Sequence, residues 1–142
     1  ALPMSLYKLV GRRPVCVNDM LNGVVPEDTI ALCGYGIDVH SAEKGGQNYL
    51  HYLELGQYYG IGYGALVPAS EVENILTAGK SVSCESGAEA AIMATALSIC
   101  DDVPVRSVDV KKLREALRRQ GALLEPEILP EAQKYDEYIF TY

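Results

Sequence analysis

The protein is a chain of 142 residues in which 49% of the residues are hydrophobic and 22% are charged, values close to those of ordinary globular domains. This composition excludes a disordered or low-complexity protein, and a formal net charge of −7 argues against a surface built to bind DNA, RNA or anionic membranes. The apolar runs are too short to span a membrane. We expect one globular domain over residues 4–142, with Met4 as the native start and residues 1–3 left over from expression.

The first half of the chain carries short apolar runs typical of β-strands. One strand is expected near residues 5–10, and three more are expected over residues 30–40, 49–55 and 60–67. Glycine-bearing loops separate the last three runs, which favours a three-stranded antiparallel meander. A helix across residues 48–58 is the competing interpretation.

The second half of the chain is patterned as helices. Ser70 and Glu73 have the spacing of a capping box, which predicts a helix over residues 71–78. A second capping box beginning at Ser86 predicts a helix that runs to about residue 100. This second helix is rich in alanine and apolar nearly all round, so we expect it to be a buried central helix of the core.

A third helix is expected over residues 110–120, with Asp109 as its N-cap and Gly121 at its end. Residues 138–142 are predicted to form a final strand. Together these elements predict an α+β fold, in which an antiparallel sheet from the N-terminal half and the C-terminal strand packs against about three helices.

Four cysteines and two histidines limit the redox and metal chemistry open to the chain. No two cysteines are spaced as C-x-x-C, and a domain of this size needs no disulfides, so we expect reduced thiols and a cytoplasmic protein. Cys84 lies two residues before the expected cap of a helix, where the helix terminus stabilises a thiolate. It is the candidate residue for a thiol-dependent enzyme or a redox protein, although the adjacent Glu85 favours the neutral thiol.

Histidine chemistry in this chain has to use a set made of Asp38, His40 and His51. The two predicted strands that carry them would form a hairpin, in which Asp38 and His40 share one face. A register that pairs His40 with an odd-numbered residue adds His51 to that face, within reach of one ion. Two imidazoles and a carboxylate can bind zinc or ferrous iron, so the set predicts a small metal-dependent enzyme. The alternative is a solvated polar face, because a slip of one residue turns His51 away.

Glycines and tyrosines alternate in two runs of the predicted sheet. Gly60, Gly62 and Ala65 formally match the dinucleotide-binding fingerprint, but extended residues follow where that fingerprint needs a helix, so we reject a nucleotide site there. The remaining functional interpretation is a surface for a ligand or a partner, because tyrosines supply flat area with a polar tip. The alternative is glycine at the bulges and bends of a twisted sheet. The candidate residues of this surface are Tyr35, Tyr58, Tyr59, Gly60, Gly62, Tyr63 and Gly64.

No sequence motif identifies a reaction, so two classes of function stay open. We favour a small intracellular binding or protein-interaction protein, because convincing catalytic clusters are few. It would be a homo-oligomer or a subunit of a complex, with a second copy of the chain or another protein as its partner, and not a membrane or nucleic acid. The alternatives are the metal-dependent enzyme, with His40 and His51 as candidate catalytic residues, and the enzyme or redox protein that uses Cys84.

Overall fold

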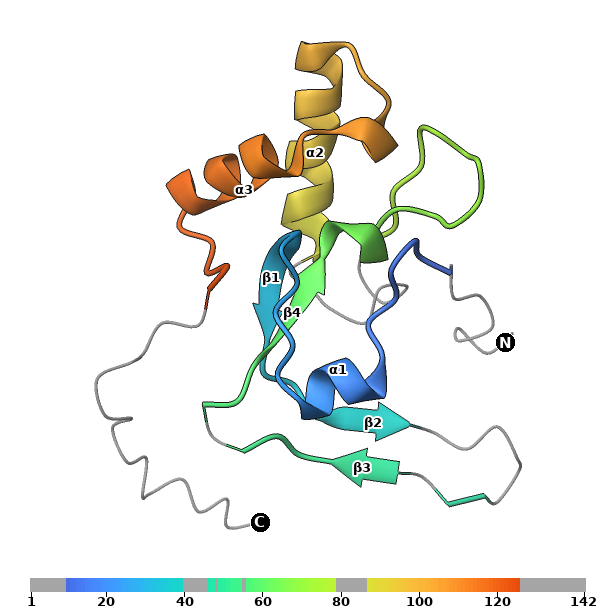
Figure 1. Cartoon of the computed structure of the whole chain (residues 1–142), viewed down its shortest axis with the longest axis vertical. Helices are drawn as coiled ribbons and strands as arrows, with labels where there is room; N and C mark the ends of the chain where they lie inside the picture. The colour runs from blue at the N-terminus through green and yellow to red at the C-terminus, as the bar shows by residue number, and fades with distance from the viewer. Residues whose placement is uncertain (1–9, 40–45, 48, 55, 79–86, 126–142) are drawn as a thin grey trace, which may run out of the picture.

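The structure is a computed structural model, and it describes residues 10–39, 46–47, 49–54, 56–78 and 87–125. Within these residues the chain forms three α-helices and two small pairs of antiparallel strands, which confirms the predicted α+β class (Figure 1). The strands expected near residues 5–10 and over residues 138–142 lie outside the described part of the chain. No helix among the described residues is long and apolar enough to cross a membrane.

The four strands form two nested antiparallel pairs. Strand β1 (Thr29–Cys33) pairs with β4 (Tyr59–Gly62), and β2 (Ile37–Val39) pairs with β3 (Tyr49–His51). The chain thus runs out along β1 and β2 and returns along β3 and β4. Figure 1 shows the β2–β3 pair at the opposite end of the molecule from α2.

The predicted three-stranded meander is therefore wrong. The run expected as one strand over residues 30–40 is broken between β1 and β2, and the run that begins near residue 60 pairs with β1 instead of β3. The break includes Gly36, where an added Cβ would lie 2.6 Å from the backbone oxygen of His51. The two backbones approach closely at this point, which lies between the β1–β4 pair and the β2–β3 pair. The competing helix across residues 48–58 is not formed, because β3 occupies its first half.

Strands β1 and β4 lie at the centre of the molecule because side chains cover both faces of this pair. Ile30 belongs to a buried cluster with residues of the helices, whereas its neighbour Ala31 packs with Ile61 on the other face. The short helix α1 (Val17–Leu21) contacts β4 there. Burial on both faces explains why residues 30–33 are apolar without the alternation expected of a half-exposed strand.

Helix α3 (Val110–Arg119) forms as its end signals predict. Asp109 is the N-cap, and its carboxylate accepts a hydrogen bond of 2.8 Å from the backbone N–H of Lys111. Gly121 follows the helix with a φ of 87°, a left-handed conformation that favours glycine. Leu113 and Leu117 are the buried residues of the helix and belong to the main core cluster.

Helix α2 (Gly87–Asp101) confirms the second predicted helix but not its burial on all sides. Ala94 is fully buried in the core, whereas Ile92 and Ile99 are 72% and 76% exposed. At 3.6 residues per turn the two isoleucines share one stripe, and Ala94 lies on the opposite side. Helix α2 therefore covers the core with one face and contacts α3 and β1.

Residues 71–78 do not form the predicted helix. Both the backbone N–H and the hydroxyl of Thr77 donate to the backbone oxygen of Leu66, at 2.9 and 3.2 Å, which folds the segment back toward the end of β4. Val72 and Ile75 are exposed, so a helix here would bury little of its apolar face. Helices this short depend on such burial, because their intrinsic stability is marginal.

Candidate functional site

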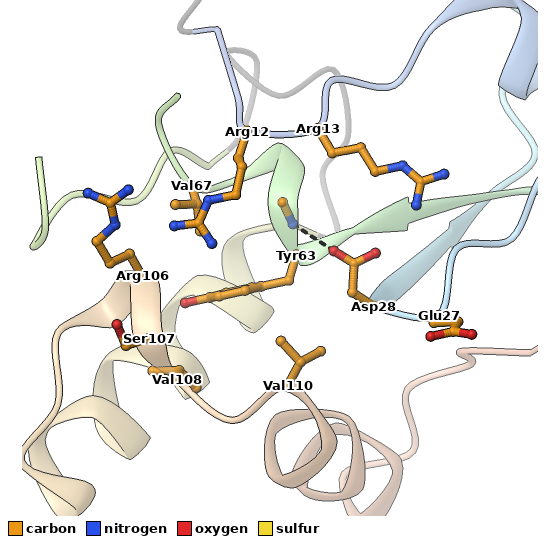
Figure 2. Close-up of a pocket in the computed structure, with 11 residues that line it drawn as sticks. Arg12, Arg13, Glu27, Asp28, Tyr63, Val67, Arg106, Ser107, Val108 and Val110 are labelled. Carbon is orange, nitrogen blue, oxygen red and sulfur yellow. Dashed lines mark hydrogen bonds between the residues drawn. The ribbon is translucent and has the colours of Figure 1, made fainter. Parts of the chain in front are cut away.

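A pocket of about 540 Å³ opens where the N-terminal segment, the end of β4 and the segment before α3 meet (Figure 2). Two short 3₁₀-helices, η1 (Tyr63–Ala65) and η2 (Val105–Ser107), contribute to its wall. Apolar surface with a few charged groups is the usual composition of a small-molecule site. The residues that line the pocket are Arg12, Arg13, Glu27, Asp28, Tyr63, Gly64, Val67, Arg106, Ser107, Val108 and Val110.

Gly11 brings the two arginines of the N-terminal segment to the pocket. A Cβ at this position would lie 2.7 Å from the backbone oxygen of Ala65, so a larger residue could not approach so closely without a shift of the backbone. The backbone N–H of Arg12 donates to the oxygen of Val67 at 2.7 Å, which anchors the segment. The side chains of Arg12 and Arg13 then line the pocket from this anchored segment.

Tyr63 lies across the pocket with its ring against the protein interior. The residue is only 3% exposed, and its hydroxyl donates a hydrogen bond of 2.6 Å to the backbone oxygen of Val105. Burial raises the pKa of Tyr63 to about 12, while the positive charge of Arg12 acts in the opposite direction. The phenol is therefore neutral near pH 7 and serves as a hydrogen-bonding group, not as a base.

The two carboxylates of the pocket lie at one end of it. Asp28 accepts a hydrogen bond of 2.9 Å from the backbone N–H of Gly64, so this carboxylate holds the turn that follows β4. In Figure 2, Arg13 extends toward this end, where Glu27 also lies. The negative charge of the pocket is thus on the side where Arg13 can offset it.

The other end of the pocket carries positive charge with little compensation. The side chain of Arg106 is 18% exposed, and its ion-pair partner Glu71 lies 3.8 Å away with a fully exposed carboxylate. Such long, solvent-exposed pairs contribute little. Among the described residues, no side chain forms a hydrogen bond or an ion pair with Arg12. The pocket therefore has an acidic end and a basic end.

The described strand pairs do not have the register that the metal hypothesis requires. Asp38 pairs with Leu50, and His51 pairs with Ile37. Directly paired positions share a face and successive positions alternate, so positions 38 and 51 lie on opposite faces of the β2–β3 pair. His40 lies outside the described residues, and no group of three potential metal ligands occurs within them. The structure thus gives the Asp38, His40 and His51 set no support as a metal site, and His51 does not line the pocket.

Most of the glycine–tyrosine residues predicted to form a surface are buried instead. Tyr59 and Tyr63 are 2% and 3% exposed, and they belong to the two core clusters. Tyr35 is 70% exposed and Tyr58 is half-buried. The glycines of the second run are buried as well, namely Gly60, Gly62 and Gly64. Most of these residues therefore pack inside the monomer, because the glycines allow neighbouring segments to approach β4.

Cys84, the thiol candidate, lies outside the described residues. Two arginines of the pocket, Arg12 and Arg106, do not emerge from the sequence analysis as site residues. An arginine pair directly before Pro14 in an acidic chain is a usable signal for the first of them. Nothing in the local sequence links that pair to Arg106, because the fold alone brings the two segments together.

Comparison with known proteins gives a match to a protein family. The sequence model of a family described as FAD dependent oxidoreductase matches residues 7–117 of the chain. No curated protein and no solved structure matches significantly. The family match overturns the prediction of a non-catalytic binding or protein-interaction protein, since the family is one of redox enzymes. The alternative of an enzyme or redox protein is closer to this family than the binding protein is, although that alternative is based on the thiol of Cys84 and not on a flavin.

The glycine run does not fit the pyrophosphate of FAD. A Cβ on Gly62 would lie 2.5 Å from a carboxylate oxygen of Asp28, and one on Gly60 would lie 2.6 Å from the hydroxyl of Thr29. The space beside these glycines is therefore filled by the chain itself and carries a negative charge. A three-residue 3₁₀-helix follows β4, where a dinucleotide site needs the N-terminus of an α-helix. We assign no FAD-binding residue in the described part of the chain.

Proposed function

We propose, since the chain belongs to the family of FAD dependent oxidoreductases, that it takes part in an oxidation or reduction that depends on FAD. The observation that carries this proposal is the family match over residues 7–117, well over half of the 142 residues. We further propose that the pocket at Tyr63 holds the substrate. The metal-dependent and thiol-dependent alternatives have no comparable support.

The composition of the pocket supports a small organic substrate. Tyr63, Val67, Val108 and Val110 supply apolar surface on which a carbon skeleton can pack. The phenol of Tyr63 is neutral and already donates to the backbone, so it can orient a substrate by accepting a hydrogen bond. Arg12 and Arg106 supply fixed positive charge at one end. These residues bind and orient, and no proton transfer is assigned to them.

The experiment that tests the proposed function measures flavin directly. FAD is titrated with the purified protein, and the fluorescence and the visible absorption of the flavin are both recorded at each step. We expect quenching of the fluorescence, a shifted absorption band and recovery of intact FAD after heat release. FMN and riboflavin serve as matched ligands that lack the adenylate half. Folded protein that neither retains FAD during purification nor perturbs the spectrum of added FAD would refute the proposal.

Three expectations from the sequence stay predictions beside this proposal: a single domain over residues 4–142, a cytoplasmic location and self-association into a homo-oligomer. The location rests on the expectation of reduced thiols, because a domain of this size needs no disulfides. Light scattering coupled to size-exclusion chromatography measures the oligomeric state, and a mass that stays at 15.4 kDa at all concentrations would contradict self-association.

A further inference from the structure

Two guanidinium groups converge in the pocket from segments far apart in the chain. Arg12 reaches the pocket from the N-terminal segment, and Arg106 reaches it from η2. Figure 2 shows both guanidinium groups above the hydroxyl end of the Tyr63 ring, with Ser107 below it. Arg13 points the other way, toward Asp28.

The described residues leave the positive charge at this end of the pocket largely uncompensated. Two like charges brought together in a half-enclosed site repel one another, and burial strengthens the repulsion. The side chain of Arg106 is largely buried, and the ion pair that it forms among the described residues is the long one to the exposed Glu71. Asp28 is engaged with the backbone of Gly64 at the other end of the pocket. An anion between Arg12 and Arg106 would remove the repulsion and complete the hydrogen bonding of both groups.

We propose that Arg12 and Arg106 form an oxyanion-binding site, which holds a carboxylate or phosphate group above Tyr63. Each guanidinium presents parallel N–H donors that match two oxygens of such a group. The Tyr63 hydroxyl already donates its proton to the backbone oxygen of Val105, so the two guanidinium groups, and not the phenol, supply the donors to the anion. The apolar side chains of the pocket would then contact the rest of the bound molecule.

This inference deepens the proposed function and rests on it for the role of the anion in a redox reaction. A carboxylate would come from a substrate that is a carboxylic acid, whereas a phosphate would come from a phosphorylated substrate. Both groups share the chemistry that the two arginines recognise. The binding itself is tested without flavin.

The test is isothermal titration of the whole protein with four sodium salts at matched ionic strength: phosphate, pyrophosphate, acetate and succinate, with chloride as the reference. We expect at least one of them to bind with one site per chain. The variants Arg12→Gln and Arg106→Gln should each weaken that binding by about tenfold or more, because each removes charge-assisted hydrogen bonds. Preference for phosphates or for carboxylates identifies the source of the anion.

Arg13→Gln is the matched control, because it removes the same charge from the same pocket on the side facing Asp28. Its binding constant should stay within about twofold of the unmodified protein. Arg106→Lys keeps the charge but loses the paired donors, so it should also weaken binding while the protein stays folded. Binding of none of the four salts beyond chloride would overturn the proposal, and so would equal weakening in all three glutamine variants.

The two proposals fail in different ways. If FAD binds and no oxyanion does, the oxyanion site is refuted and the flavin proposal stands. If an oxyanion binds with the expected arginine dependence and FAD does not, the flavin proposal is refuted and the site stands.

Discussion

The hydroxyl of Tyr63 donates a hydrogen bond of 2.6 Å to the backbone oxygen of Val105, and this bond joins the end of β4 to the segment that leads into α3. Both residues are buried, so water cannot replace the bond when it is lost. The same ring lies beneath Arg12 and Arg106 in the pocket. One tyrosine thus links the packing of the core to the geometry of the proposed anion site.

Replacing Tyr63 by phenylalanine should destabilise the fold. The variant keeps the ring but removes the short bond to the oxygen of Val105, which retains only the longer bond of 3.4 Å from the backbone N–H of Val108, so the loss should be about 1 kcal/mol. Urea unfolding followed by circular dichroism measures the change in the free energy of unfolding. Tyr35→Phe is the control, because Tyr35 is mostly exposed and its variant should stay within about 0.5 kcal/mol. Equal stability of the two variants would contradict the structural role of this bond.

Alkaline pH should weaken the fold through the same residue. Burial raises the pKa of Tyr63 to about 12 in the folded protein, while an unfolded tyrosine has a pKa of about 10. As the pH rises above about 10, the unfolded chain releases a proton that the folded protein retains, so the free energy of unfolding falls. The measurement is the urea midpoint between about pH 9 and about pH 11. Tyr63→Phe should show a smaller fall than the unmodified protein, and an identical fall would contradict the assignment.

Local signals predicted the parts of this fold that depend on neighbouring residues. Asp109 and Gly121 lie at the two ends of α3 because capping chemistry acts over three or four residues. The capping-box pattern at Ser70 predicts a helix that does not form. The backbone N–H of Thr77 donates to the carbonyl of Leu66 instead, and the apolar side chains Val72 and Ile75 are exposed. A local pattern predicts a helix only where the tertiary structure does not compete for its backbone groups.

Long-range relationships could not be read from the sequence. Strand β1 pairs with β4 around the β2–β3 pair because of the way distant chain segments pack together. The same apolar runs could also pair in another order or register, and the sequence does not distinguish these arrangements. The position of Arg12 and Arg106 in one pocket has the same origin, because it follows from the packing of the N-terminal segment on the end of β4. Glycine suggested an open surface in the sequence, but Gly62 instead accommodates Asp28.

Adding a methyl group at Gly62 should destabilise the protein. The Cβ of Gly62→Ala would lie 2.5 Å from a carboxylate oxygen of Asp28, and that carboxylate is held by the backbone of Gly64. Overpacking of this kind costs about 1–3 kcal/mol, which chemical denaturation measures. At Gly34 the nearest atom to an added Cβ is 3.5 Å away, so Gly34→Ala should be neutral or slightly stabilising. A stable Gly62→Ala protein would show that Asp28 can move aside.

Loss of the N-cap of α3 should have a measurable cost that a conservative change avoids. Asp109→Ala removes the acceptor for the backbone N–H groups of Lys111 and Lys112, at a cost of about 1 kcal/mol. Asp109→Asn keeps an oxygen in the same place and should retain most of the stability. Thermal unfolding of the two variants side by side measures the difference. If both lose the same amount, the contribution is the charge of Asp109 and not its hydrogen bonds.

The one-sided burial of α2 predicts opposite responses on its two faces. Ala94 is fully buried in the core, so Ala94→Leu would have to displace neighbours and should cost about 1–3 kcal/mol. Ile92 lies on the opposite side and is mostly exposed, so Ile92→Lys should change the free energy of unfolding by no more than about 0.5 kcal/mol. Urea unfolding of both variants gives the comparison. A large loss in Ile92→Lys would mean that this face is covered in solution, as the composition of the helix alone suggests, and light scattering on the same samples would show whether a second copy covers it.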